Sequence, residues 1–212
     1  MSRGPSMPLP AHLMEPFYTL CWELASNPEY VLQEHAIRVR PTHTTRRHAL
    51  AALWMTACAM RFSELRRLRT SDVSQSGFHA YVTRSKGGLS GQVPLSKSLI
   101  ATTFTWREER TETLTSPWLL PSRTGNPLSI NSFNRDAGNL FEALLGIKVL
   151  SHSFRCTAAQ LAIVQGSKAR EAQSLLGHKS QHTTELYLQK IATRAFQLSL
   201  FEQVRDQKQV AS

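Results

Sequence analysis

The side chains best able to do chemistry lie in four short segments. They are AMRFSELRRL with Arg61, TRSKGGL with Lys86, LSHSFRC with His152 and Arg155, and LLGHKSQHTTELYL with His178 and Tyr187. Breaking a phosphodiester bond without a metal requires a nucleophile, donors for the developing negative charge and an acid for the leaving oxygen. A phenol, two guanidinium groups, two imidazoles and an ammonium group can meet these three needs.

The spacing within the segments supports this chemistry. His152 and Arg155 are three residues apart, so one face of a helix presents both. Glu64 follows Arg61 by three residues and can reach its guanidinium across one helical turn. Simpler interpretations exist for each group: a lone tyrosine is more often a packing residue, and the Arg61–Glu64 pair alone could equally be a surface ion pair.

The order and spacing of the four segments resemble the tyrosine recombinases of the phage-integrase family, which cut and rejoin DNA through a phosphotyrosine. In that family a Leu-Gly-His turn precedes the nucleophile, usually through Thr-Thr. Here His178 and Tyr187 are nine residues apart, with Thr183-Thr184 between them. The resemblance covers residues 45–190 and implies a fold that is mainly α with a small antiparallel β-sheet.

The resemblance also implies a role for each motif residue. Tyr187 is the nucleophile, Arg61 and Arg155 hold the non-bridging oxygens, Lys86 protonates the leaving 5′ oxygen, His152 acts as base or phosphate donor, His178 donates to the phosphate, and Glu64 steadies the site. Two positions depart from the family pattern. Cys156 stands where a second histidine usually follows the arginine, and Ala59 stands where a glycine commonly precedes the first arginine.

The charge of the chain indicates a polyanionic partner. A net charge of +10 and a pI near 10.1 make nucleic acid the first candidate. A membrane is a poorer candidate, because the chain has no apolar run of about 18 residues. The N-terminus shows no basic, apolar signal peptide, so we do not expect secretion. We expect the further arginines to form a DNA-facing or solvated surface; they are Arg66, Arg67, Arg69 and Arg84.

Two observations bear on metals and on compartment. His178 and His182 are four residues apart, but no carboxylate or cysteine partner accompanies them, so a metal site is not favoured. The chemistry implied by the resemblance needs neither a metal nor a nucleotide cofactor. The three cysteines, Cys21, Cys58 and Cys156, lack a C-x-x-C spacing and lie in apolar stretches, which predicts reduced core thiols in a cytoplasmic protein.

The apolar periodicity predicts the elements that position these residues. Helices are expected over residues 11–25, 46–60, 63–69, 97–112, 130–145, 152–165, 169–176, 184–190 and 193–205. Strands are expected over residues 78–83 and 92–95, with Lys86 on the tip of their hairpin, and a short strand and loop over 118–129.

The domain division follows from these elements. We expect an irregular segment over residues 1–10, the catalytic domain over 11–190, and a C-terminal helix and tail over 191–212 that contacts a neighbouring protomer. Family members usually carry an N-terminal helical domain that clasps the other face of the DNA, and too few residues precede the first catalytic helix to form it. The resemblance is therefore to the short recombinases, such as the fimbrial-switch invertases, or to a truncated chain.

The favoured function is site-specific recombination of double-stranded DNA at specific repeats, with integration, excision or inversion as the outcome. By resemblance, four protomers self-associate on synapsed DNA, and accessory DNA-bending proteins are a further class of partner. Two alternatives stay open: a catalytically weak relative that regulates by binding DNA, and a type IB topoisomerase, which shares the chemistry.

Overall fold

The computed structural model describes residues 9–35, 42–85, 88–164 and 176. Within these residues the chain is mainly helical with one small antiparallel sheet, which confirms the expected fold class. The helices are α1 (Ala11–Ser26), α2 (Pro28–Glu34), α3 (Thr42–Ala57), α4 (Phe62–Leu65), α5 (Lys97–Glu108), α6 (Thr111–Leu114), α7 (Ile130–Leu145), α8 (Ser151–Val164) and the short 3-10 helix η1 (Thr70–Asp72); the strands are β1 (Val73–Ser74), β2 (His79–Val82) and β3 (Gly91–Pro94).

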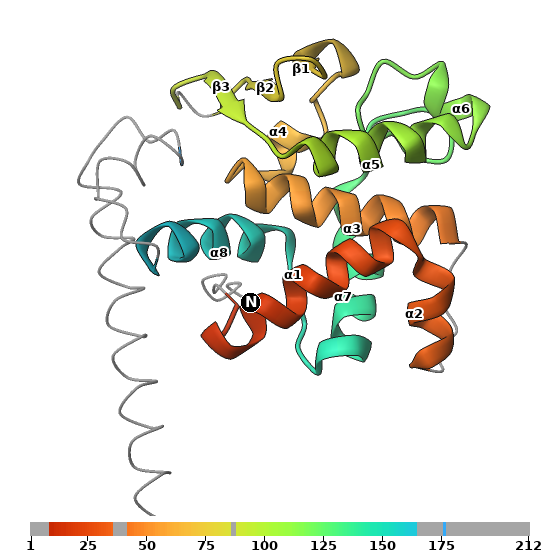
Figure 1. Cartoon of the computed structure of the whole chain (residues 1–212), viewed down its shortest axis with the longest axis vertical. Helices are drawn as coiled ribbons and strands as arrows, with labels where there is room; N and C mark the ends of the chain where they lie inside the picture. Colours follow the sequence, from red (N-terminus) through yellow and green to blue (C-terminus); the bar gives the residue numbers. More distant parts are fainter. Residues whose placement is uncertain (1–8, 36–41, 86–87, 165–175, 177–212) are drawn as a thin grey trace, which may run out of the picture.

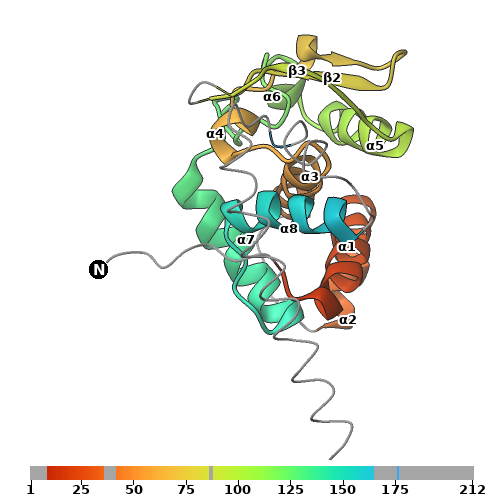
Figure 2. The ribbon, with the colours of Figure 1, turned by 90° about the vertical axis from the view of Figure 1, so that its left-hand side faces the viewer.

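Helix α3 is the centre of the fold. Residues 49–55 are apolar on every side of the helix, and all seven are buried. A helix that is apolar all round needs partners all round, and α3 packs against α1, α2, α4, α5, α7 and α8. Figure 1 shows it between the sheet layer and the lower helices, and Figure 2 shows it nearly end-on among its neighbours.

An aromatic cluster joins the helices on one side of α3. Phe17 of α1 lies 5.1 Å from Phe141 of α7 and 5.5 Å from Phe154 of α8, measured between ring centres. Phe133 of α7 lies 6.0 Å from Phe154. All four rings are at most 1% exposed. Because Phe154 immediately precedes Arg155, this cluster fixes the part of α8 that carries a predicted site residue.

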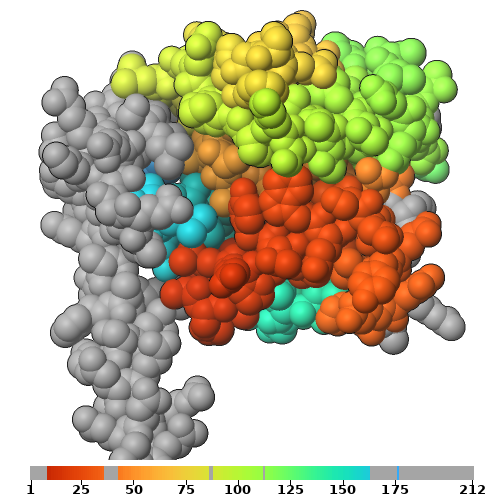
Figure 3. All heavy atoms as spheres, viewed as in Figure 1, coloured from red at the N-terminus to blue at the C-terminus, as the bar shows by residue number. Residues whose placement is uncertain are grey.

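The sheet and α5 form the layer on the other side of α3. The strand order is β1-β2-β3, all antiparallel, and Ala80 pairs with both Val73 and Val93. The indole Nε1 of Trp54 donates a hydrogen bond to Thr103 Oγ1 at 2.9 Å, which joins α3 to α5 through buried groups. In the space-filling view, α1 and α5 meet over α3 and cover most of it (Figure 3).

Most expected elements are present, with identifiable differences. Helix α7 has the expected ends, and α8 begins one residue earlier than expected. The single helix expected over 97–112 is instead α5 and α6, because the Thr113 hydroxyl donates to the Arg107 and Arg110 carbonyls where α5 ends. The expected helix over 63–69 is only one turn long, and the expected strand within 118–129 contributes only isolated pairings.

Three elements were not expected: α2, the 3-10 helix η1 and strand β1. The Asn27-Pro28 break does end α1, but Asn27 also caps α2 by accepting a hydrogen bond from the Tyr30 N–H. Strand β1 has two residues, too few for an alternation to be visible. None of the helices in the described ranges is long and apolar enough to cross a membrane. The helices expected over 184–190 and 193–205 lie outside the described residues, as does 169–175.

Candidate active site

The turn between α3 and α4 places Arg61. The turn follows the Schellman pattern, because Met60 N–H donates to the Met55 carbonyl (3.1 Å) and Ala59 N–H to the Thr56 carbonyl (3.3 Å). Ala59 occupies the left-handed position of this motif with φ 46°, where glycine is the usual residue. Arg61 then caps α4 with an extended backbone (ψ 154°), and its side chain is 26% exposed.

Glu64 holds Arg61 from inside the protein. Its carboxylate accepts hydrogen bonds from the Arg61 N–H at 2.9 Å and from the Arg61 Nη1 at 3.0 Å. The Glu64 side chain is only 1% exposed, so this is an interior ion pair rather than a surface pair. The expected contact between the two residues is therefore present.

The β2–β3 segment supplies further donors to Glu64. The Ser85 N–H and hydroxyl each donate to Oε1 at 3.0 Å, and Arg84 Nη1 donates to Oε2 at 3.2 Å. Burial, the largest single influence, would raise the pKa of Glu64. Hydrogen bonds from Ser85 and Arg61 and the charge of Arg84 outweigh it and lower the pKa from 4.5 to about 2. The carboxylate is therefore ionised at any neutral pH.

Helix α8 brings Arg155 to the same turn. Its side chain is buried, with Nη1 donating to the Ala59 carbonyl and Nη2 donating to the Leu176 carbonyl at 2.6 Å. Leu176 belongs to the LLGH motif and packs with Ala59, Ala158 and Ala159 in a small buried cluster. Residues from three distant segments thus converge on the Ala59 peptide.

His152 stands one turn before Arg155 on α8 and is exposed. Three influences lower the pKa of His152 below 6.5. The largest is partial desolvation, and the others are the positive charges of Arg155 and Arg61. These influences show that the imidazole shares one electrostatic environment with both guanidinium groups. The imidazole is therefore largely neutral at pH 7 and able to accept a proton. The start of α8 is fixed by Asn134 of α7, whose Oδ1 accepts from the Ser151 N–H at 3.0 Å.

The structure thus brings together four of the predicted site residues: Arg61, Glu64, His152 and Arg155. Lys86, His178 and Tyr187 lie outside the described residues. Ser85 is the last described residue before Lys86, and its hydrogen bonds to Glu64 bring the chain at that point to the Arg61 turn.

The expected placement of Arg84 is corrected by the structure. Its side chain is 3% exposed and lies in the interior, so it is not part of a DNA-facing surface. The alternation of the strand contains the signal that could have indicated this: Ala80, Val82 and Arg84 fall on one face, and all three are buried. The prediction of a surface position for Arg84 followed from its positive charge rather than from this alternation.

The other three expected surface arginines are exposed. Arg67 and Arg69 line a hollow of about 590 Å³ between α4 and the sheet. Arg69 also stacks its guanidinium 5.2 Å above the Trp118 ring, and its N–H donates to Asp72. Asp72 and Glu64 are the acidic residues lining this hollow, so its charge is mixed rather than purely basic.

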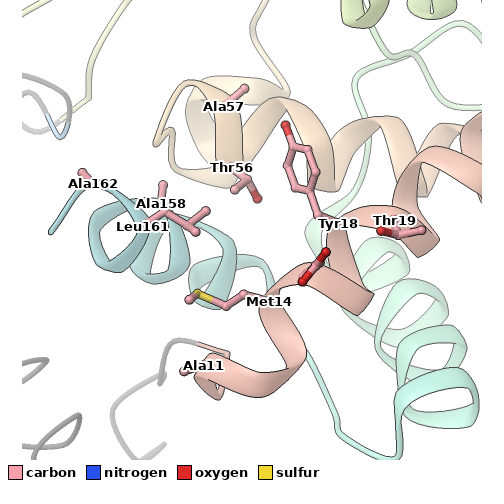
Figure 4. Close-up of a pocket in the computed structure, with 10 residues that line it drawn as sticks. Ala11, Met14, Tyr18, Thr19, Thr56, Ala57, Ala158, Leu161 and Ala162 are labelled. Carbon is pink, nitrogen blue, oxygen red and sulfur yellow. The ribbon is translucent and has the colours of Figure 1, made fainter. Parts of the chain in front are cut away.

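A larger groove lies where α1, α3 and α8 meet. Its volume is about 680 Å³, and α1, α3 and α8 line it; Figure 4 shows Tyr18 of α1 and Leu161 of α8 on opposite sides of it. Among the described residues that line it, Glu15 is the one charged side chain and none is a lysine or an arginine. The arginine cluster, whose guanidinium groups can bind phosphate oxygens, is the better candidate for anion chemistry.

Comparison with known proteins bears directly on this cluster. The model of the phage integrase family matches residues 30–194, which contain all six motif residues. The chain belongs to the phage integrase family. The resemblance inferred from the four motifs is therefore confirmed, although the match does not itself test the role of any single residue.

Two relatives place this integrase-family chain more closely. It is 35% identical over 159 residues to tyrosine recombinase XerD of Rhizobium meliloti (strain 1021), an alignment covering 72% of this chain and 50% of that protein. It is 30% identical over 160 residues to type 1 fimbriae regulatory protein FimB of Escherichia coli (strain K12), covering 73% and 78%. The chain thus spans half the length of the first relative.

Solved structures establish the fold of this integrase-family chain. The crystal structure of XerA recombinase superposes with a TM-score of 0.63 at 22% identity, covering 90% of this chain and 66% of that one. A lambda integrase tetramer bound to a Holliday junction superposes with a TM-score of 0.59 at 22% identity, covering 88% and 49%. The described fold is that of the tyrosine recombinase catalytic domain.

Proposed function

We propose that this chain is a site-specific DNA recombinase that cuts and rejoins DNA strands through a 3′-phosphotyrosyl intermediate. The observation that carries the proposal is the convergence of Arg61 and Arg155 on the α3–α4 turn, with His152 one turn before Arg155 on α8. Two permanently charged guanidinium groups beside one neutral imidazole can stabilise a phosphate that gains negative charge in the transition state.

The proposed reaction assigns one task to each group. Tyr187 attacks the scissile phosphorus, and His152 accepts the phenol proton, for which a pKa below 6.5 leaves it free at neutral pH. Arg61, Arg155 and His178 stabilise the pentacoordinate phosphate. Lys86 donates a proton to the 5′ oxygen as the phosphorus–oxygen bond breaks. Attack by the 5′ hydroxyl of a partner strand reverses these steps, so the reaction consumes no cofactor.

The proposal extends to assembly and compartment. Residues 11–190 form the catalytic domain, and the tail over 191–212 contacts a neighbouring protomer. The tetramer named for lambda integrase supports self-association on synapsed DNA repeats, with accessory DNA-bending proteins as further partners. Exposed Arg66 and Arg67 contribute phosphate contacts. The protein acts in the cytoplasm, in keeping with its buried free thiols Cys21 and Cys58.

A second candidate is a regulator that binds DNA without cutting it. The similarity to FimB, which is named a fimbriae regulatory protein, supports this second candidate. The two candidates differ in covalent chemistry, so we test them by capturing covalent adducts from a pool of nicked duplexes of random sequence. Sequencing the captured DNA also identifies the site.

The recombinase yields adducts that survive denaturation and map to Tyr187. Tyr187→Phe binds the selected DNA with unchanged affinity and yields none. Arg61→Ala and Arg155→Ala each slow adduct formation about 10²- to 10³-fold, the usual cost of losing one preorganised donor. Arg66→Ala weakens binding and flattens its dependence on salt instead. Selective binding without any adduct would establish the regulator, and an adduct persisting in Tyr187→Phe would refute the nucleophile.

A further inference from the structure

Arg84 is a cation whose side chain is buried in the protein interior. It follows β2 on the inward face of the strand, after Ala80 and Val82, and its side chain is 3% exposed. Moving a guanidinium group out of water is strongly unfavourable unless acceptors surround its N–H groups. Acceptors at the α3–α4 turn meet this requirement.

Two acceptors from that turn and one from α4 bind Arg84. Nη1 donates to the Glu64 Oε2 and to the Ala59 carbonyl, both at 3.2 Å, and Nη2 donates to the Cys58 carbonyl at 2.8 Å. Only a fork of N–H groups reaches a carboxylate and two successive carbonyls together. Arg84 thereby joins the β2–β3 segment to the turn that precedes Arg61.

The acceptors of Arg84 also hold the two predicted catalytic arginines. The Glu64 carboxylate accepts from Arg61, and the Ala59 carbonyl accepts from Arg155. The direction of that carbonyl depends on the left-handed conformation of Ala59, which is unfavourable for an alanine. Donors on the carbonyl from two guanidinium groups offset this cost.

We propose that Arg84 is a positioning residue for the phosphate-binding arginines: by holding Glu64 and the Cys58–Ala59 carbonyls, it sets where Arg61 and Arg155 stand. This inference rests on the proposed function for its catalytic consequence, but not for its geometry. The acceptors described for the Arg84 guanidinium are protein groups, so the proposal gives Arg84 a positioning role and no phosphate contact.

The test compares Arg84→Lys with Arg107→Lys. Lysine keeps the positive charge and removes the fork, so a change reflects geometry rather than lost charge. Arg107 is a matched control: it is also buried, and its guanidinium binds only backbone carbonyls among the contacts described, those of Thr113, Ser116, Trp118 and Leu119. None of these carbonyls belongs to the α3–α4 turn. Both variants are assayed without urea, at a temperature at which unfolding measurements show that they are folded.

We expect Arg84→Lys to slow adduct formation about 10- to 100-fold at saturating protein, since small misplacements of catalytic groups have effects of this size. DNA affinity stays within about twofold, and the salt dependence of binding is unchanged. Arg107→Lys loses stability but, when folded, reacts at the wild-type rate. Wild-type rates in folded Arg84→Lys would overturn the proposal, as would a salt dependence reduced by about one phosphate contact.

A second readout is independent of recombination. The charges of Arg155 and Arg61 help to lower the pKa of His152, so NMR titration of this imidazole reports where the two guanidinium groups stand. In Arg84→Lys we expect the His152 pKa to rise toward 6.5, and in Arg107→Lys we expect no change. A His152 pKa unchanged in both variants would overturn the positioning role, even if wild-type protein formed no adduct. A wild-type protein that forms no adduct would refute the proposed function but not the positioning role of Arg84.

Discussion

Replacing Glu64 by glutamine tests the central electrostatic element of the site. The ionised carboxylate accepts five hydrogen bonds from described residues: two from Arg61, one from Arg84 and two from Ser85. Glutamine has nearly the same shape, but its amide nitrogen cannot accept, and it carries no charge to balance the arginines. The buried position leaves little room for water to compensate.

The lowered pKa sets the size and the pH window of the effect. One pKa unit corresponds to about 1.4 kcal/mol, so the difference between 4.5 and about 2 contributes roughly 3 kcal/mol to the free energy of unfolding. Because the pKa is depressed in the folded state, this stability is fully present above pH 4.5. It is lost progressively as the pH falls from 4.5 toward 2 and the carboxylate takes up a proton.

The assay is urea unfolding followed by tryptophan fluorescence at a series of pH values. At pH 7 we expect Glu64→Gln to unfold with a free energy about 3 kcal/mol below the wild type. The difference should shrink below pH 4.5 and largely vanish near pH 2. Glu142→Gln is the control, since that carboxylate is 53% exposed and 3.9 Å from Lys148. Parallel wild-type and Glu64→Gln curves across this range would refute the reasoning.

Three further predictions concern neighbouring features. Ala59→Gly should change the free energy of unfolding by less than about 1 kcal/mol, because relief of the left-handed strain opposes the loss of a buried methyl group and the greater freedom of the unfolded chain; urea unfolding that shows a loss above 2 kcal/mol would contradict this balance. Phe154→Ala should cost about 3–5 kcal/mol in the same assay, since the ring is fully buried among three others, and a loss below 1 kcal/mol would mean that the cluster repacks. The adduct rate should rise with pH through a pKa below 6.5 and level off by neutral pH as His152 loses its proton, and His152→Gln should abolish that acid limb; a limb that remains would assign it to another group.

The sequence by itself determined the parts of the molecule that depend on local pattern. The apolar periodicity of α1, α7 and α8 and the continuous apolar run of α3 predicted these helices, because a side chain's face on a helix follows from its position alone. The three-residue spacing predicted the Arg61–Glu64 contact. The motif order predicted the family, which the match over residues 30–194 confirms. The roles of Lys86 and Tyr187 stay predictions.

Only the tertiary structure decided which cations are buried and which acceptors hold them. Arg107 lies near the end of α5, and its buried guanidinium donates to the carbonyls of Ser116 and Leu119, nine and twelve residues further along the chain. Arg84 and Arg155 meet at the Ala59 carbonyl from 25 and 96 residues away in the chain. An arginine can be buried only where acceptors replace its water. Those acceptors come from distant segments, so no local sequence pattern specifies them. Only the folded chain brings Arg84 and Arg155 together at the Ala59 carbonyl.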